Sequence, residues 1–377
     1  MAVDANVKTK GDQKKLRFYH VRNWLGMPLS VWLPLLARNH FAATRIGQVL
    51  RMMMFASVNS LMHRADQLIY ARRVRRAPKP EPPLFVVGHW RTGTTMLHEL
   101  LVQDEQFAFP TTYQVMGPHH FLLSERFFPK LIAHAMPARR PMDAMAVGFD
   151  KPQEDEFALC NMGLPSPYLK WAFPRHYAEP GLYLDVDEWD EAERRRWIDG
   201  MVWFMRRLAW RDRRRMVLKS PTHTARLRTL AEAFPGAQFI HIVRDPYTVF
   251  ASTVHTWKQL WESLAFHSPH FDGIEEYVLA TFERMYLSFE RARPTIPQEQ
   301  FYELRYEDLV REPVAEMEKA YDHLRLNNFT AARPKLEAYF AKRRDYRTNR
   351  HEISADLRAA IAKRWSGYIR RYGYESS

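Results

Sequence analysis

The sequence has few of the features of a secreted or membrane-spanning protein. It contains a single cysteine, Cys160, so no disulfide can form within the chain. Its start, MAVDANVKTKGDQKK, lacks the apolar core and cleavage site of a secretory signal. The most apolar early stretch, residues 24–37, is shorter than the roughly 20 residues that cross a bilayer, and it contains Pro28 and Pro34. We therefore expect a cytoplasmic protein without a membrane span.

Internal repeats and low-complexity segments are also absent from the sequence. Its 377 residues include 14 Gly, 24 Pro and 46% hydrophobic residues, as expected of a globular chain with a large core. The 16 His and one Cys form no pattern typical of a metal site, so we predict no metal. Lys and Arg outnumber Asp and Glu by 56 to 43, and this net charge of +13 favours anionic ligands such as nucleotides or acidic lipid headgroups. We predict no nucleic-acid partner.

Short apolar runs alternate with helical patterns after residue 83. Strands are predicted at residues 84–87, 216–218, 238–243 and 300–305. Each run leads through a short loop into a helix, which predicts an α/β fold with a P-loop-like central parallel sheet flanked by helices. We divide the chain into an N-terminal helical extension over residues 1–80, packed on the core, and an α/β domain over residues 81–377. The α/β domain carries an acceptor-pocket insertion at about 107–215.

The N-terminal extension is rich in Leu, Met, Trp and Arg and has two interpretations. Over residues 17–75, apolar positions recur near helical spacing, so several helices are predicted. The favoured interpretation is that these helices pack on the main domain. The alternative is that they form an apolar wall for a hydrophobic acceptor or make peripheral contact with a membrane surface.

A glycine-rich loop follows the first predicted strand. Gly88-His-Trp-Arg-Thr-Gly-Thr-Thr95 has two glycines five positions apart between a strand and a helix. In such a loop, backbone amides and the helix N-terminus bind phosphate, and Gly93 allows close approach of the main chain. The lysine usual in nucleotide triphosphatases is replaced by Thr94, and the cation lies inside the loop at Arg91. This pattern suits a donor with one 5′-phosphate joined to a second group better than ATP with magnesium.

A second basic motif follows the strand predicted at residues 238–243. Arg244 lies at its carboxyl end, and Asp245 and Pro246 are typical of the N-cap and first position of a helix. Ser252 lies two turns along that helix, where its hydroxyl can add to an anion site formed with Arg244. Alone, this pattern also fits an Asp-Pro turn and a serine that faces solvent.

Together, the two motifs resemble the sulfotransferases that use 3′-phosphoadenosine-5′-phosphosulfate (PAPS), particularly the bacterial branch with an R-T-G-T-T loop. Further similar segments are KPQEDEFAL at 151–159, VLKSPTHT at 217–224 and ELRYEDLVREP at 303–313. The resemblance implies transfer of a sulfuryl group from PAPS to a hydroxyl of a small-molecule, lipid or sugar acceptor by in-line displacement, without a metal. The alternatives are a P-loop kinase that uses ATP and a non-catalytic protein that binds anions or a membrane surface.

The resemblance also assigns the donor-binding residues. It implies that the 5′-phosphosulfate is bound by Arg91, Thr92, Gly93, Thr94 and Thr95, and the 3′-phosphate by Arg244 and Ser252. Because cytosolic members carry lysine where Arg91 stands, and arginine is a poor acid, we assign Arg91 to electrostatic stabilisation of the leaving group. Lys219, at the end of another predicted strand, is either a second catalytic cation or a surface lysine.

The sequence offers two candidates for the general base. The acceptor hydroxyl must lose a proton as it attacks, so a carboxylate or imidazole is expected within hydrogen-bond reach. Glu154 is favoured because related bacterial enzymes look similar at this segment, and His223 is the alternative. Residues 151–156 are predicted to open a helix with Pro152 near its first position. The aromatic-rich region 107–180 is expected to supply an apolar acceptor pocket.

Overall fold

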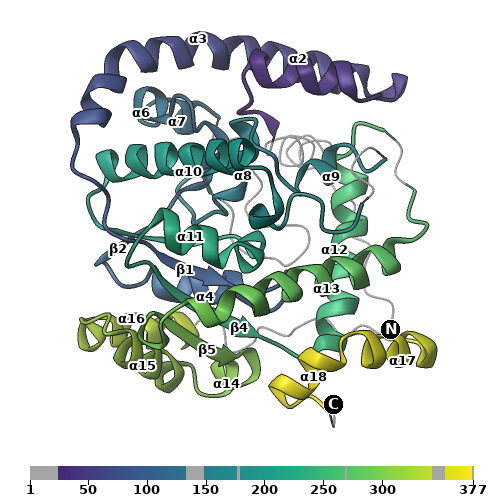
Figure 1. Cartoon of the computed structure of the whole chain (residues 1–377). Helices are drawn as coiled ribbons and strands as arrows, with labels where there is room; N and C mark the ends of the chain where they lie inside the picture. Colours follow the sequence, from purple (N-terminus) through teal and green to yellow (C-terminus); the bar gives the residue numbers. More distant parts are fainter. Residues whose placement is uncertain (1–23, 133–147, 176–178, 268–269, 342–352, 376–377) are drawn as a thin grey trace, which may run out of the picture.

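A five-stranded parallel sheet forms the centre of the protein (Figure 1). The computed structural model describes residues 24–132, 148–175, 179–267, 270–341 and 353–375. The strands are β1 (Leu84–Val87), β2 (Phe107–Ala108), β3 (Arg215–Lys219), β4 (Gln238–Val243) and β5 (Phe301–Arg305), in the order β2-β3-β1-β4-β5. All pairs are parallel. The predicted α/β fold is therefore confirmed.

Helices cover both faces of the sheet (Figure 1). Their bounds are α2 (Leu29–Arg38), α3 (Ile46–Arg76), α4 (Thr94–Leu101), α5 (Thr112–Met116), α6 (Phe121–Ser124), α7 (Phe128–Ile132), α8 (Glu156–Asn161), α9 (Leu169–Ala172), α10 (Glu191–Arg211), α11 (Leu227–Ala233), α12 (Pro246–Leu264), α13 (Ile274–Ala292), α14 (Tyr306–Arg311), α15 (Pro313–Leu324), α16 (Phe329–Ala341), α17 (Ala355–Arg364) and α18 (Ser366–Tyr372). Alternate residues of β1 pack into two different hydrophobic cores, one on each face of the sheet. Leu84 and Val86 pack with α4, α15 and α16. Phe85 and Val87 belong to the larger core, with α10 to α13.

The strand order places the functional loops together. Because β1 is central and β3 and β4 flank it, the loops that follow these three strands meet at one edge of the sheet. In open α/β sheets, ligands bind in the crevice outside the carboxyl ends of the strands, where the strand order reverses. The fold therefore brings together Arg91, Lys219 and Arg244, which follow or end β1, β3 and β4.

The four predicted strands match the structure closely, but a fifth strand, β2, was not predicted. Strands β1 and β4 have the predicted bounds, and β3 and β5 differ from them by at most one residue at each end. Strand β2 has only two residues, Phe107 and Ala108, and pairs with β3 at the edge of the sheet. A strand this short has no readable alternation of polar and apolar residues, so only its partner reveals it.

In the N-terminal region, α2 and α3 form a layer across the end of the molecule opposite the C-terminal helix α18 (Figure 1). Buried Trp32, Met52 and Ala56 join the larger core, as packing on the main domain requires. Residues 1–23, which belong to the predicted extension, lie outside the described residues. In the part of the chain that is described, no helix is long and apolar enough to cross a membrane. The domain boundaries stay a prediction.

Candidate active site

The loop between β1 and α4 has a backbone that few residues tolerate. Gly88 and Gly93 have φ angles of 148° and 107°, and between them Arg91 has a φ of 71° although it is not a glycine. A side chain at Gly93 would place its Cβ 2.5 Å from the Tyr306 ring. Strain of this kind is kept where surrounding contacts over-determine the conformation, often at functional sites. The loop is therefore held in one shape by its packing.

The two basic motifs meet at this loop. The Arg91 side chain donates from Nε to the Ser252 hydroxyl at 2.9 Å, and Arg244 donates from Nη1 to the Arg91 carbonyl at 3.0 Å. The Arg244 guanidinium also lies 4.0 Å from the centre of the Tyr306 ring. Among the residues that the structure describes, no carboxylate lies within ion-pair distance of Arg244. Its positive charge is therefore available to an anionic ligand.

Helix α12 begins as the sequence predicts. Asp245 is the N-cap and accepts a hydrogen bond from the Thr248 amide, while Pro246 occupies the first turn. The Asp245 amide is bound by Glu307 of α14, at 2.9 Å. These contacts fix the start of α12 and hence the position of Ser252, which is buried on this helix. The alternative of a solvent-facing serine is wrong.

Lys219 and Glu154 form an ion pair beside the loop. Lys219 ends β3 and is almost completely buried, and its Nζ lies 2.6 Å from Glu154 Oε1 and 3.4 Å from Thr95 Oγ1. The other carboxylate oxygen of Glu154 accepts a hydrogen bond from the Tyr168 hydroxyl. Burial and the nearby charge of Glu154 raise the pKa of Tyr168 well above its usual range, so the phenol stays protonated as a donor. The surface-lysine alternative for Lys219 is wrong.

The next two acidic residues bind the same strand-end segment. Asp155 accepts hydrogen bonds from Ser220 at 2.9 Å and from His223 Nε2 at 2.6 Å. Burial raises the pKa of Asp155, but the charge of His223 and these two hydrogen bonds outweigh burial and lower it. Glu156 is fully buried against Arg226, at 2.6 Å, and Thr222, at 2.8 Å. Three consecutive acids are thus each bound by the last residue of β3 or by the segment that follows it.

These contacts explain one wrong prediction from the sequence. Residues 151–154 do not open a helix with Pro152 near its first position, because α8 begins at Glu156. Pro152 instead lies in an isolated antiparallel bridge with Thr111. The segment is irregular because consecutive side chains at 154–156 all reach the end of β3 or the loop after it, and a helix would point neighbouring side chains in different directions.

His223, the alternative base, is enclosed. It lies on the 3₁₀ turn Pro221–Ala225 and has no exposed surface. Its Nε2 is occupied by Asp155, and its Nδ1 is buried without a hydrogen-bond partner. The ring also contacts Phe85 and Trp197 edge-on. This arrangement anchors the Asp155 carboxylate and gives the imidazole no open path to a substrate.

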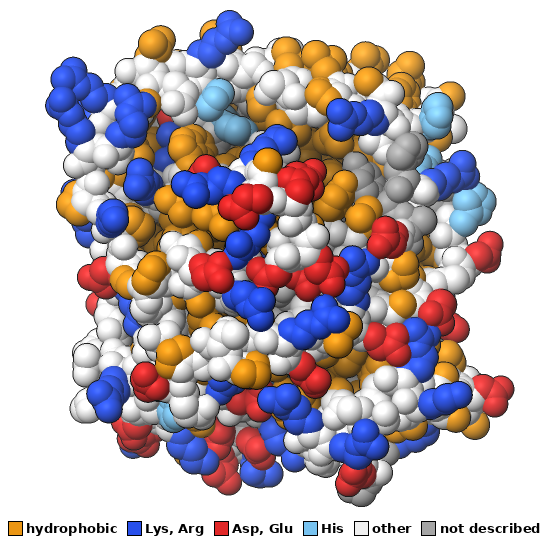
Figure 2. All heavy atoms as spheres, viewed as in Figure 1, with side chains coloured by type: hydrophobic (Ala, Val, Ile, Leu, Met, Phe, Trp, Pro, Cys, Tyr) orange, Lys and Arg blue, Asp and Glu red, His pale blue; other side chains and the backbone are white. Residues whose placement is uncertain are grey.

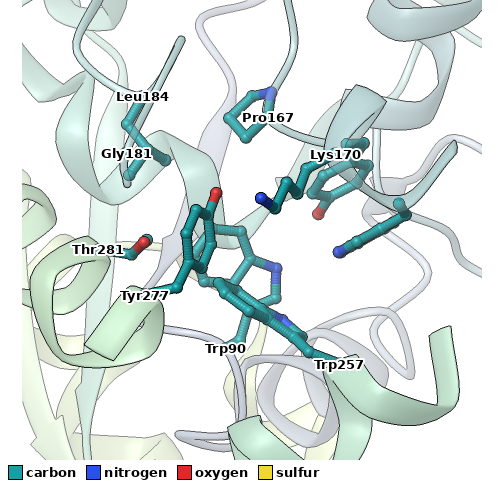
Figure 3. Close-up of a pocket in the computed structure, with 10 residues that line it drawn as sticks. Trp90, Pro167, Lys170, Gly181, Leu184, Trp257, Tyr277 and Thr281 are labelled. Carbon is teal, nitrogen blue, oxygen red and sulfur yellow. The ribbon is translucent and has the colours of Figure 1, made fainter. Parts of the chain in front are cut away.

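A narrow aromatic pocket (Figure 3) is connected to the ion pair through the hydrogen bond from Tyr168 to Glu154. It is lined by Trp90, Pro167, Tyr168, Lys170, Trp171, Gly181, Leu184, Trp257, Tyr277 and Thr281. Trp90 belongs to the loop after β1, and Tyr168 connects the pocket to Glu154. The pocket volume is about 10 Å³, room for about one water molecule, so a larger ligand must move side chains to enter.

Lys170 and Tyr277 separate this pocket from a larger cavity. Both residues also line a space of about 340 Å³ together with Trp261 and His267. The Lys170 ammonium lies 4.4 Å from the centre of the Tyr277 ring and 5.1 Å from that of Trp261, and it donates to the Pro174 carbonyl at 2.9 Å. Burial lowers the pKa of Lys170 to about 8.

No cluster of three or more His, Cys, Asp or Glu that could hold a metal occurs in the described ranges.

The comparison with protein families identifies the chain. A model described as the sulfotransferase family matches residues 82–331, about two thirds of the sequence. The chain belongs to the sulfotransferase family. It is therefore an enzyme, and the resemblance noted in the sequence is confirmed at the level of the family. The kinase and the non-catalytic alternatives are wrong.

Curated relatives and solved structures agree with this assignment. The sulfotransferase is 40% identical over 354 residues to proteins named omega-hydroxy-beta-dihydromenaquinone-9 sulfotransferase Stf3 from Mycobacterium bovis and Mycobacterium tuberculosis, covering 93% of this chain and 91% of each relative. It shares its fold with the sulfotransferase STF9 from Mycobacterium avium, with a TM-score of 0.68, 21% identity and 98% of both chains covered. STF1 from M. tuberculosis aligns with a TM-score of 0.60, 19% identity, and 95% and 93% coverage.

Reasoning from the sequence missed several residues of the sulfotransferase site. Tyr168 and Lys170 lie in an aromatic-rich stretch that only suggested packing, although both fall within the expected pocket region 107–180. Trp257 and Tyr277 come from α12 and α13, outside that region. Nothing in their sequence spacing distinguishes them from core residues of amphipathic helices.

Proposed function

We propose that this sulfotransferase uses PAPS as donor. The observation that carries the proposal is the direct contact between the two basic motifs, through Arg91, Ser252 and Arg244. One bisphosphorylated nucleotide has two anionic ends, and a guanidinium without a carboxylate partner beside a loop of backbone amides suits them. The sulfotransferase family also implies this donor.

Each residue of the proposed donor site has a role that its position supports. The amides of Thr92, Gly93, Thr94 and Thr95 bind the 5′-phosphosulfate at the start of α4, and Arg244 and Ser252 bind the 3′-phosphate. Arg91 leaves Ser252 to reach the oxygen that bridges phosphate and sulfur. Lys219, which lies next to Thr95, adds a second positive charge there. Fixed cations at that oxygen stabilise the negative charge that develops in the transition state.

We assign the general base to Glu154. Its carboxylate is oriented by Lys219 on one oxygen and Tyr168 on the other, and Tyr168 lines the aromatic pocket. The acceptor hydroxyl attacks sulfur while its proton passes to Glu154, and the bond from sulfur to the bridging oxygen breaks. The donor supplies the sulfuryl group and leaves as adenosine 3′,5′-bisphosphate. The enclosed ring of His223 supports an anchoring role instead.

For the acceptor, we propose an alcohol with an apolar body, such as a lipid or polyprenyl alcohol. The pocket beside Glu154 is lined by tryptophan and tyrosine rings. The cavity beyond Lys170 is larger and has a mixed lining, with Trp261 and Tyr277 beside charged residues such as Asp272 and Glu276. The 40% identical relatives are named for a hydroxylated menaquinone derivative, which is a lipid of this kind. Metal independence, the absence of a nucleic-acid partner and a cytoplasmic location stay predictions.

The direct test is sulfation of a panel of alcohols. Purified protein is incubated with ³⁵S-labelled PAPS and sterol, phenol, polyprenyl and sugar alcohols, with EDTA present or absent, and products are identified by mass spectrometry. We expect a sulfate on the polyprenyl alcohol at a rate that EDTA does not change. Sulfation of sugars alone would refute the apolar acceptor, and tight ATP binding without binding of adenosine 3′,5′-bisphosphate would refute the donor.

A further inference from the structure

Helix α3 carries apolar side chains on both its inner and its outer side. Its inner side buries Val49, Met52, Ala56 and Val74 together with the polar Gln48, Asn59 and Asp66. Its outer side exposes large apolar side chains, with Leu50 63%, Leu61 70% and Leu68 88% exposed. A surface helix of a soluble protein normally turns its apolar stripe to the core and its polar residues to water. We therefore expect the outer side of α3 to contact an apolar partner.

The exposed apolar residues are concentrated on α2, α3 and the segment between them, and those of α3 form a stripe along the helix. Nine of the thirteen large apolar side chains that are exposed in the described residues lie between positions 33 and 69: Leu33, Phe41, Ile46, Leu50, Met54, Val58, Leu61, Leu68 and Ile69. Those of α3 follow one another mostly at intervals of three, four or seven residues, which places them on one side of the helix. Apolar side chains crowd the top edge of the molecule, over α2 and α3, in Figure 2. We call these nine residues and their flanking arginines the α2–α3 face.

The same face carries positive charge and almost no negative charge. Residues 24–76 contain eight arginines and a single acid, Asp66. Asp66 is fully buried and pairs with Arg207 at 2.7 Å, so it contributes no exposed negative charge. Exposed Arg64, Arg72 and Arg75 lie on α3 beside or beyond the apolar stripe. An apolar stripe bordered by arginines suits insertion at the boundary between acyl chains and anionic headgroups.

We infer that the α2–α3 face docks on the surface of a bilayer that contains anionic lipids. The helices lie in the plane of the interface, since none of those described can span the membrane. A second copy of the chain is a poorer partner, because a twofold contact through this face would bring arginines against arginines with no exposed acid to pair them. Headgroup phosphates supply the charge that the face lacks.

Docking in this orientation also brings the acceptor pocket near the lipid. This step of the inference rests on the proposed function. Trp32 of α2 packs edge-on against Phe266 at 5.2 Å, and Phe266 stacks on Phe173 at 5.5 Å. The Phe266 amide donates to the carbonyl of Ala172, the last residue of α9. Helix α9 carries Lys170, which lines both cavities. The α2–α3 face and the pocket are thus linked by a short chain of packed residues.

The test is flotation of the full chain with phosphatidylcholine vesicles, with and without phosphatidylglycerol. We expect the wild type to float with the anionic vesicles. The double variant Leu61→Asp/Leu68→Asp should lower the vesicle binding constant about tenfold or more. Arg72→Gln/Arg75→Gln should lower it about 25-fold, since each basic residue at an anionic surface contributes about fivefold. Leu287→Asp, at a 50% exposed leucine of α13, is the matched control and should bind like the wild type.

Several outcomes would overturn the inference. These are equal binding to neutral and anionic vesicles, no flotation at all, or a concentration-dependent dimer in light scattering that Leu61→Asp/Leu68→Asp abolishes. Binding of adenosine 3′,5′-bisphosphate separates the two proposals. If vesicle docking holds while the nucleotide does not bind, the proposed function fails and the docking stands. If the docking variants keep nucleotide binding and sulfate a short soluble alcohol, the loss is one of membrane contact alone.

Discussion

The buried ammonium of Lys170 leads to a prediction that differs from the usual effect of a core substitution. Lys170 is 7% exposed, and its cationic contacts are aromatic rings and one backbone carbonyl. Its pKa is about 8 in the folded protein, against an ordinary value of 10.5. Each pH unit of difference corresponds to about 1.4 kcal/mol. Keeping this side chain charged at pH 7 therefore costs roughly 3 kcal/mol of folding stability.

Replacement by methionine should recover part of this cost. Lys170→Met keeps the length and apolar stem of the side chain, removes the charge and leaves the rings in contact with a thioether. The variant also loses the cation–π contacts and the hydrogen bond to Pro174, and this loss cancels about 1 to 2 kcal/mol of the recovered stability. We expect the free energy of unfolding in urea at pH 7 to rise by about 1 to 2 kcal/mol. Lys363→Met, at an exposed lysine of α17, should change it by less than about 0.5 kcal/mol.

The pH dependence gives a second readout of the same reasoning. Because the folded pKa lies below the unfolded value, the unfolded chain binds more protons between about pH 8 and 10.5, and wild-type stability gains from Lys170 across that window. Lys170→Met lacks this gain, so the difference between the two proteins should shrink as the pH rises. A variant less stable than the wild type at pH 7, with a difference that does not change with pH, would refute a costly buried ammonium here.

Three further predictions concern the donor site and the base. Arg244→Ala should weaken the binding of adenosine 3′,5′-bisphosphate by about 2 to 4 kcal/mol in calorimetry. Arg311→Ala, at an exposed arginine, is the control, and unchanged affinity of the Arg244 variant would exclude Arg244 from the site. Glu154→Gln should lower kcat about 100- to 1,000-fold with a much smaller change in KM for PAPS, and near-normal turnover would exclude Glu154 as base. Gly93→Ala, whose Cβ would meet the Tyr306 ring at 2.5 Å, should destabilise the fold by about 1 to 3 kcal/mol in urea, and full stability would show that the loop can relax.

Much of the sheet and the meeting of the two basic motifs could be predicted from the chain alone. The strands at 84–87 and 238–243 are short apolar runs next to turn residues, and they were placed with their observed bounds. Arg91 and Arg244 follow those strands directly, so their meeting at one edge of the sheet is a consequence of parallel pairing. Local patterns were sufficient here because each motif spans only a few neighbouring residues.

Local patterns failed where contacts between distant segments decide the structure. Pro152 looked like the start of a helix, but pairing of the following acids with the segment after β3 moved the helix start to Glu156. Strand β2 is too short to carry its own signal. The partner of Glu154 could not be read from the sequence, because Lys219 lies 65 residues away along the chain.

Some features of this sulfotransferase thus depend on local sequence, and others depend on its tertiary structure. The order of apolar runs, glycines and basic residues determined the α/β fold and the glycine-rich loop after β1, because the backbone geometry of strands and loops depends on residues that are adjacent in sequence. Only the tertiary structure decided which carboxylate the pocket residue Tyr168 binds, which rings line the pocket, and that a stripe of apolar residues on α3 faces outward. Those features depend on packing between segments far apart in the chain, and a helical stripe of leucines looks the same in sequence whether it faces a core or a membrane.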